Sequence, residues 1–203
     1  MTGVRRHAAD SITLLRLALA VPFALAAWHA AHGGAAWPAA LLYAGIALSD
    51  FLDGRLARRF GVVSPRGQAL DHCTDLAFIL LALATYVALG RVPWWVPAAI
   101  AASFTAYRLD SLSCGTAPAP LIGSRIGHVG GVANYGVVGM LVLDQCLGPS
   151  WLPAELLRGV FVAVPIYSGL SIAARLNARR SRIRTAPDRC WRPARTCRAG
   201  KTD

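Results

Sequence analysis

The amino-acid sequence predicts an all-α polytopic membrane protein with six transmembrane helices. Of its 203 residues, 55% are hydrophobic, and the mean hydropathy is +0.46; soluble domains are normally about 45–50% apolar. The apolar residues form continuous blocks of about 20 residues, the length of a helix that crosses a bilayer core. Because these blocks do not alternate between apolar and polar residues, they favour helices over the strands of a membrane barrel.

The spans are expected, in chain order, at residues 12–31, 35–60, 68–89, 93–112, 126–147 and 153–176. The segments "HGGAA", "GRVPWW" and "LGPSWLP" are typical of tight Gly/Pro turns between paired spans. Tryptophans stand at these turns, as aromatic residues do at a membrane interface: Trp37, Trp94, Trp95 and Trp151.

The first span is also consistent with a signal peptide, because it has a basic start and small residues near its end. We favour a span, since its apolar stretch is long. It also contains Arg16, which needs a polar destination: the lipid headgroups, reached by snorkelling, or a phosphate of a substrate. These two interpretations of Arg16 remain open.

The distribution of basic residues predicts the orientation. The formal net charge is +11, and Lys201 is the only lysine. The arginines gather in short loops beside apolar segments and in the tail formed by residues 177–203, which favours contact with anionic lipid over nucleic-acid binding. By the positive-inside rule, both termini and the loop after the second span lie in the cytoplasm. The arginine-rich composition favours a bacterial inner membrane.

The five cysteines form no CxxC pair and no metal-ligand spacing, so we expect free thiols. A role for Cys190 and Cys197 in the tail stays open. The tail shows no apolar periodicity, and we expect it to be disordered.

Four aspartates gather between Ser49 and Asp75, although the whole chain has only 10 acidic residues. Asp50 and Asp53 share one face of a helix, and Asp71 and Asp75 share one face of the next. The short linker makes these helices antiparallel, so the four carboxylates should converge at the cytoplasmic ends of the spans. Such a cluster is stabilised best by divalent cations, and paired Mg²⁺ or Mn²⁺ ions serve phosphoryl chemistry.

Small residues accompany the aspartates. Gly54, Ala57 and Gly67 remove bulk beside the carboxylates, which lets a phosphorylated ligand approach the backbone. Arg58 shares the acidic face and is suited to phosphate oxygens. The alternative for Gly54 and Ala57 is close helix packing.

The complete pattern is Asp50-x2-Asp53-Gly54-x2-Ala57-Arg58-x8-Gly67-x3-Asp71-x3-Asp75. It resembles the signature of the CDP-alcohol phosphatidyltransferases at each of these positions. The stretch "SITLLRLALAVPFALAA" resembles the first span of phosphatidylglycerophosphate synthases, with Thr13, Arg16 and Pro22 in similar places.

The resemblance implies an enzyme of phospholipid biosynthesis. It would transfer a phosphatidyl group from CDP-diacylglycerol to an alcohol acceptor and release CMP. Residues 1–176 would form the six-helix catalytic domain, and the enzyme would be a homodimer. Two divalent ions, Mg²⁺ or Mn²⁺, would be held by Asp50, Asp53, Asp71 and Asp75. Asp75 would also act as the base, and the cytidine diphosphate site would be lined by Gly54, Ala57, Arg58 and Gly67.

Several alternatives remain open. Within the family, one alternative is that the enzyme is specifically a phosphatidylglycerophosphate synthase. Outside the family, the alternative is an ion-coupled transporter, since acidic residues in spans also mark ion pathways. The cluster lies at one membrane face and no span is broken there, which favours the enzyme over the transporter. The intact motif also argues against a non-catalytic family member.

Other polar residues are secondary candidates. For Arg108 two interpretations remain open. It could pair with Asp110, or it could bind a phosphorylated acceptor together with Arg125. We expect His72 to point away from the acidic face. The repeat of Gly123, Gly127 and Gly131 predicts close helix packing with His128 at its edge. Asn134 and Tyr135 are interpreted as packing residues or interhelical hydrogen-bonding residues.

Overall fold

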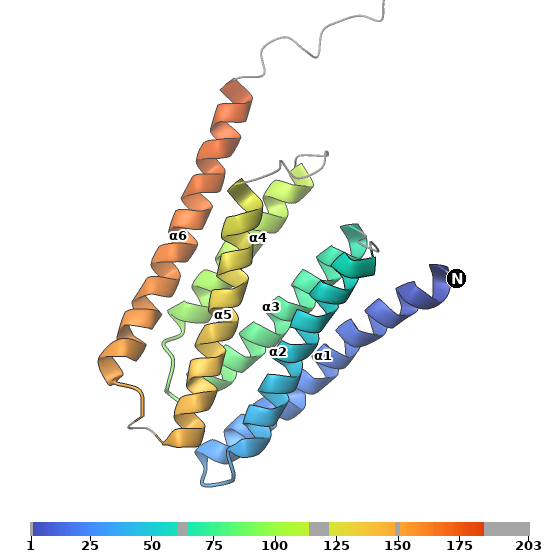
Figure 1. Ribbon diagram of the computed structural model, residues 1–203. Helices are drawn as coiled ribbons and strands as arrows, with labels where there is room; N and C mark the ends of the chain where they lie inside the picture. Colours follow the sequence, from blue (N-terminus) through green and yellow to red (C-terminus); the bar gives the residue numbers. More distant parts are fainter. Residues whose placement is uncertain (1, 61–64, 114–121, 149–150, 185–203) are drawn as a thin grey trace, which may run out of the picture.

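The chain folds into helices throughout the part that the structure describes (Figure 1). The computed structural model describes the backbone of residues 2–60, 65–113, 122–148 and 151–184, and the side chains of residues 16–52, 71–109, 130–148 and 151–177 and of Arg180. These residues contain no strand. The helices are α1 (Thr2–Ala31), α2 (Trp37–Phe60), α3 (Pro65–Ala88), α4 (Trp95–Ser113), α5 (Ile122–Leu147) and α6 (Ala154–Arg184). Each predicted span falls on one of them, which confirms the all-α prediction with six helices.

Three helices are followed, within two residues of their last residue, by a glycine that has a positive φ. Gly33, Gly90 and Gly148 have φ values of 92°, 69° and 99° after α1, α3 and α5. Glycine adopts this left-handed conformation at little cost and closes the last helical turn. After α3, for example, the amide of Arg91 donates to the carbonyl of Tyr86 at 2.9 Å. The three turns lie at one end of the bundle (Figure 1), as the Gly/Pro segments predicted.

Two helices are longer than the predicted spans. α1 begins at Thr2, well before residue 12, and α6 continues past residue 176 to Arg184. The predicted tail therefore begins as helix, and residues 185–203 lie outside the described part. The added residues are mainly polar or charged and form no apolar block, so the apolar pattern did not include them in the spans.

The bundle has two groups of helices, joined by α5. α1 packs against α2 and α3, whereas α4 packs mainly against α6. α5 contacts α1, α2, α3 and α6. The core between them is apolar and includes Phe23, Phe78, Leu83, Tyr86 and Val138, each 0% exposed. Phe23 and Phe78 meet edge to face with centroids 5.4 Å apart, a favoured aromatic geometry.

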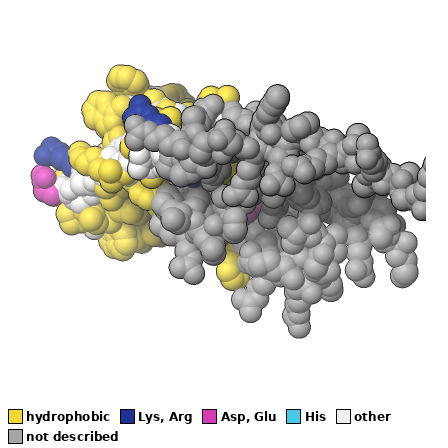
Figure 2. Space-filling model, turned by 90° about the horizontal axis from the view of Figure 1, so that it is seen from above, with side chains coloured by type: hydrophobic (Ala, Val, Ile, Leu, Met, Phe, Trp, Pro, Cys, Tyr) yellow, Lys and Arg dark blue, Asp and Glu magenta, His cyan; other side chains and the backbone are white. Residues whose placement is uncertain are grey.

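The outer surface is also apolar. Large hydrophobic side chains are exposed on all six helices, Leu25, Leu41, Leu81, Leu109, Val132 and Leu170 among them. Viewed along the bundle, the described side chains in Figure 2 are mainly hydrophobic. Two segments, Asp71–Ala88 and Ala154–Asn177, are long and apolar enough to cross a membrane, and Arg16–Ala31 and Trp37–Leu52 are shorter apolar helices. The number of spans therefore stays a prediction.

Candidate active site

Arg16 lies at the centre of the acidic cluster. Arg16 is a charged residue among the apolar residues of α1, and only 1% of its surface is exposed. Its Nη1 donates to Oδ1 of Asp71 at 2.8 Å and to Oδ1 of Asp75 at 2.6 Å. Its Nη2 lies 3.3 Å from Oδ1 of Asp50. Arg16 therefore does not snorkel to the headgroups; its positive charge is compensated inside the protein.

The aspartates come from α2 and α3. Asp71 and Asp75 are four residues apart on α3, so both face α1, and Asp50 reaches the same guanidinium from α2. Among the described residues, α2 and α3 each pack on α1 and not on each other. The predicted convergence of these three aspartates is confirmed. Among the described side chains, Asp50 of α2 is joined to Asp71 and Asp75 of α3 through Arg16.

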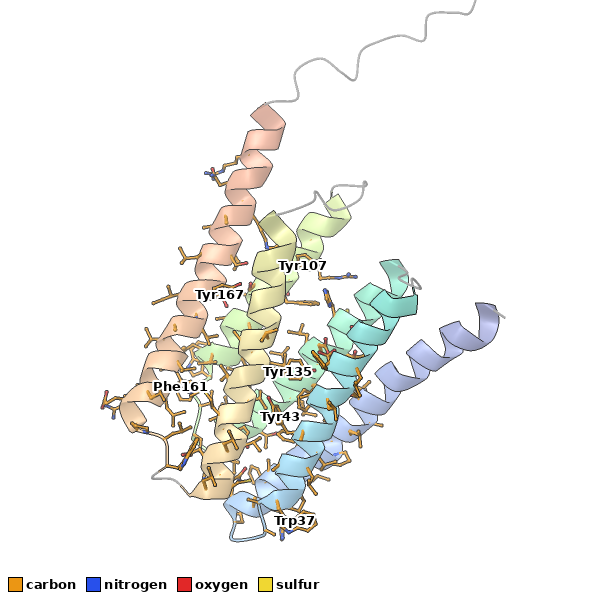
Figure 3. All side chains as sticks on the ribbon, viewed as in Figure 1. Trp37, Tyr43, Tyr107, Tyr135, Phe161 and Tyr167 are labelled. Carbon is orange, nitrogen blue, oxygen red and sulfur yellow. The ribbon has the colours of Figure 1, made fainter. Side chains whose placement is uncertain are left out.

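A tyrosine on α5 completes the surroundings of Asp75. The hydroxyl of Tyr135 donates to Oδ1 of Asp75 at 2.9 Å, and its ring stacks on Phe78 with centroids 5.8 Å apart. The hydroxyl of Tyr43 donates to the main-chain carbonyl of Tyr135 at 2.7 Å. Figure 3 shows Tyr43 and Tyr135 close together in the middle of the bundle. α5 is thus fixed against α2 at the level of the site.

The carboxylates retain oxygen atoms that suit a hard cation. Within the described part of the chain, every hydrogen bond to the side chains of Asp71 and Asp75 falls on Oδ1, so Oδ2 of each accepts none. The side chains of Asp50, Asp71 and Asp75 are 33%, 36% and 19% exposed, so solvent reaches the cluster although Arg16 is buried. Mg²⁺ and Mn²⁺ prefer such carboxylate oxygens, and the residues therefore fit a divalent-metal site.

His72 lies nearer to this site than the sequence predicted. One possible ligand atom from each of Asp71, His72 and Asp75 lies within 4.8 Å of the others. The expectation that His72 points away from the acidic face is therefore wrong. Its exposed ring also lies 6.4 Å from that of Tyr107 on α4. Helical position alone did not predict this, because a long side chain can swing toward a neighbouring turn.

For the remaining motif residues, the structure shows only the helix on which each one lies. Asp53, Gly54, Ala57 and Arg58 belong to α2 and Gly67 to α3. Their side chains, and those of Asp110, Arg125 and His128, lie outside the described ones, as do Cys190 and Cys197. Their predicted roles stay predictions.

A second polar group lies between α4 and α6. The guanidinium carbon of Arg175 stands 4.7 Å above the ring centroid of Tyr107. Its Nε is buried and has no hydrogen-bond partner among the described residues. Arg108, half-buried, follows Tyr107 on α4. Neither Tyr107 nor Arg175 stood out in the sequence, since Arg175 lies at the end of the last predicted span, directly before the arginine-rich tail.

The opposite end of the bundle has a separate hydrogen-bond network. The hydroxyl of Tyr86 donates to Oε1 of Gln145 at 3.0 Å, and Nε2 of Gln145 donates to the carbonyl of Ala27 at 2.8 Å. Nearby, Arg91 lies 3.8 Å from Oδ2 of the buried Asp144. These contacts join α1, α3 and α5 far from the acidic cluster.

The glycine packing expected on α5 is wrong at Gly131, and other glycines of the same helix make the close approaches. A Cβ atom on Gly131 would meet nothing within 4 Å, whereas one on Gly139 would lie 2.7 Å from the Tyr43 hydroxyl oxygen, and one on Gly130 would lie 3.0 Å from the Tyr167 ring. Gly123 and Gly127 lie outside the described side chains. The close approaches therefore involve tyrosines of α2 and α6.

An apolar helical bundle with a carboxylate cluster suited to divalent ions has the features of a membrane protein that binds metal ions. The chain matches the CDP-alcohol phosphatidyltransferase family over residues 6–170, and it belongs to that family. A Mycobacterium tuberculosis protein named "Probable phosphatidylglycerophosphate synthase" is 30% identical over 172 residues, which cover 82% of this chain and 80% of the relative. A Mycobacterium bovis protein named "Putative cardiolipin synthase" is 31% identical over 151 residues, which cover 70% and 66%.

The family assignment decides the class of the protein. The chain is a phosphatidyltransferase enzyme of phospholipid biosynthesis and not an ion-coupled transporter. The resemblance drawn from the aspartate motif is thereby confirmed. The family uses divalent metals, which agrees with the oxygen atoms that the cluster offers.

Proposed function

We propose that this enzyme transfers a phosphatidyl group from CDP-diacylglycerol to an alcohol acceptor and releases CMP. The convergence of Asp50, Asp71 and Asp75 on one point, with partly exposed oxygens, carries the proposal. The pyrophosphate of the donor is anionic and lies at headgroup depth, so it needs concentrated positive charge near the membrane surface.

Two divalent ions, Mg²⁺ or Mn²⁺, would be held by Asp50, Asp53, Asp71 and Asp75. When bound, such ions neutralise the pyrophosphate and stabilise the departing CMP. Asp75 is the proposed base. Because Arg16 and Tyr135 both contact its Oδ1, its Oδ2 is left to face a ligand and accept the proton of the acceptor hydroxyl. Gly54, Ala57, Arg58 and Gly67 would line the cytidine diphosphate site.

For the acceptor we favour glycerol 3-phosphate, the substrate of a phosphatidylglycerophosphate synthase. Arg175, whose buried Nε has no hydrogen-bond partner within the described part of the chain, and the neighbouring Arg108 offer positive charge on the α4–α6 side of the bundle. Arg125 would add to it. Phosphate oxygens pair well with guanidinium groups. The second candidate acceptor is another phospholipid, since one relative carries the name of a cardiolipin synthase.

We further propose six membrane spans, with residues 1–176 as the catalytic domain and residues 177–203 as a basic tail. Exposed apolar side chains on every helix support insertion in lipid. The active site and both termini would face the cytoplasm of a bacterial inner membrane, and the enzyme would be a homodimer.

The direct test uses the purified protein in detergent with CDP-diacylglycerol, Mn²⁺ or Mg²⁺, and a panel of alcohols, with CMP release as the readout. We expect release only with a metal and with the correct acceptor, and most strongly with glycerol 3-phosphate. No CMP release with any acceptor, at any concentration of either ion, would contradict the proposal.

A further inference from the structure

The charge on Arg16 is permanent and shielded from solvent. Its side chain is 0% exposed, and a guanidinium does not lose its proton in proteins. An isolated buried charge is costly, so it persists only with ionic partners. Among the described residues, its ionic partners are Asp50, Asp71 and Asp75, at distances between 2.6 and 3.3 Å.

The described contacts of Arg16 to the cluster fall on one oxygen of each carboxylate, namely Oδ1 of Asp50, Asp71 and Asp75. The three carboxylates remain partly exposed while the guanidinium is buried. Arg16 therefore fills the inner side of the cluster, and a ligand entering from solvent meets the outer side.

The balance of charge is uneven. One guanidinium faces three carboxylates in the described part, and Asp53 adds a fourth to the motif. The net negative charge of the cluster attracts cations from solvent. Without Arg16, however, the ion-free cluster would lose the buried cation that faces these three carboxylates, and the lower dielectric beside an apolar core would strengthen their repulsion.

We propose that Arg16 is a built-in counter-cation of the acidic cluster, a positioning residue that holds the carboxylates together in the ion-free protein and keeps divalent-ion binding reversible. The role rests on the proposed metal binding by the same aspartates. It differs from a purely structural tie between α1, α2 and α3. A tie stabilises the protein equally with and without ions, whereas a counter-cation matters most when the ions are absent.

The test compares thermal unfolding of the full-length protein in detergent, in EDTA and across a Mn²⁺ titration. The variants are Arg16→Gln, Arg16→Lys and the matched control Arg158→Gln, an exposed arginine whose ionic partner among the described residues is Glu155. In EDTA we expect Arg16→Gln to unfold roughly 10 °C below the wild type, since removing one partner of a buried ion pair is strongly destabilising. Arg158→Gln should match the wild type.

Mn²⁺ should restore most of the stability that Arg16→Gln loses. The Mn²⁺-induced rise in unfolding temperature should therefore exceed that of the wild type. In Arg16→Gln, half-saturation should require a Mn²⁺ concentration at least about threefold lower than in the wild type. Binding of Mn²⁺ is favoured there because it relieves the repulsion between carboxylates in the ion-free protein. A structural tie predicts the reverse, weaker binding of Mn²⁺ after the cluster loses its order.

Two further variants keep the proposal falsifiable if Arg16→Gln does not fold. Arg16→Lys keeps the charge and should regain at least half of the lost stability in EDTA. Arg16→Gln/Asp71→Asn removes a carboxylate together with the guanidinium and should be more stable in EDTA than Arg16→Gln. A lysine variant no better than glutamine, equal losses with and without Mn²⁺, or weaker Mn²⁺ binding would each overturn the counter-cation role.

The single variant Asp71→Asn separates this proposal from the proposed function. If Asp71→Asn leaves the response to Mn²⁺ unchanged, metal binding by the cluster is wrong, and the reversible-binding part of the Arg16 role falls with it. If that response is lost but Arg16→Gln is as stable in EDTA as the wild type, metal binding stands and the Arg16 role alone is wrong.

Discussion

Tyr135 donates a hydrogen bond from α5 to Oδ1 of Asp75 on α3 at 2.9 Å, across 60 positions of sequence. Arg16 contacts the same oxygen at 2.6 Å. Two donors on one carboxylate oxygen fix the rotation of the carboxyl group. The other oxygen is thereby aimed away from both donors, which is the orientation that a general base at this position needs.

We therefore expect Tyr135→Phe to lower kcat for phosphatidyl transfer by roughly 10- to 100-fold, the equivalent of losing one hydrogen bond to a charged group. The KM for CDP-diacylglycerol should change little. The matched control is Tyr86→Phe, another buried tyrosine, whose hydroxyl bonds Gln145 at the opposite end of the bundle. If both variants lose activity equally, the effect is one of folding and not of Asp75.

The aspartates themselves provide a stricter test. Asp71→Asn and Asp75→Asn should abolish CMP release, because each removes a carboxylate charge that divalent ions need. Asp144→Asn is the control, since Asp144 is a buried aspartate of α5 at the far end of the bundle. Near-normal activity in Asp71→Asn or Asp75→Asn, with the protein folded by circular dichroism, would contradict the assignment of the site.

The approach of α5 to α2 predicts a stability effect that is independent of catalysis. A Cβ atom on Gly139 would stand 2.7 Å from the Tyr43 hydroxyl oxygen. Tyr43 would have to move, and its bond to the Tyr135 carbonyl would lengthen or break. We expect Gly139→Ala to lower the free energy of unfolding by about 1–3 kcal/mol, as overpacking usually does.

The control for this substitution is Gly136→Ala on the same helix. Gly136 is exposed and a Cβ there meets nothing within 4 Å, so the better helix propensity of alanine should leave stability equal or raise it by up to about 1 kcal/mol. Thermal unfolding in detergent measures both variants. Equal behaviour of the two alanines would show that the Tyr43 contact does not constrain α5.

The helices and the acidic cluster were predictable from the sequence because both depend on local sequence patterns. The Gly/Pro segments that contain Gly33, Gly90 and Gly148 separate the apolar blocks and determine where α1, α3 and α5 end. Asp71 and Asp75 share a face through helical spacing alone. The polar ends of α1 and α6 have no such pattern, and the predicted spans therefore stopped short of them.

The contacts between distant helices were not predictable in the same way. Arg16 was conspicuous as a charge in an apolar span, but its partners on α2 and α3 depend on how the three helices pack. Tyr135 and Tyr43 look like ordinary packing residues in sequence, and their hydrogen bond joins positions 92 residues apart. No single-sequence periodicity reports such a pair; only the tertiary arrangement brings them together.

The last prediction concerns the acceptor. Arg175 lies against the face of Tyr107, and its buried Nε has no hydrogen-bond partner among the described residues. A buried donor of this kind is costly unless a ligand or water satisfies it. If the acceptor is glycerol 3-phosphate, Arg175→Gln should raise its KM by roughly 10- to 100-fold through the loss of a charged hydrogen bond, with the KM for CDP-diacylglycerol nearly unchanged. Arg180→Gln, at an exposed position on the same helix, should leave both KM values as in the wild type.

A rise in the KM for the donor alone would instead place Arg175 at the CDP-diacylglycerol side of the site, and the α4–α6 surface would no longer serve as the acceptor pocket.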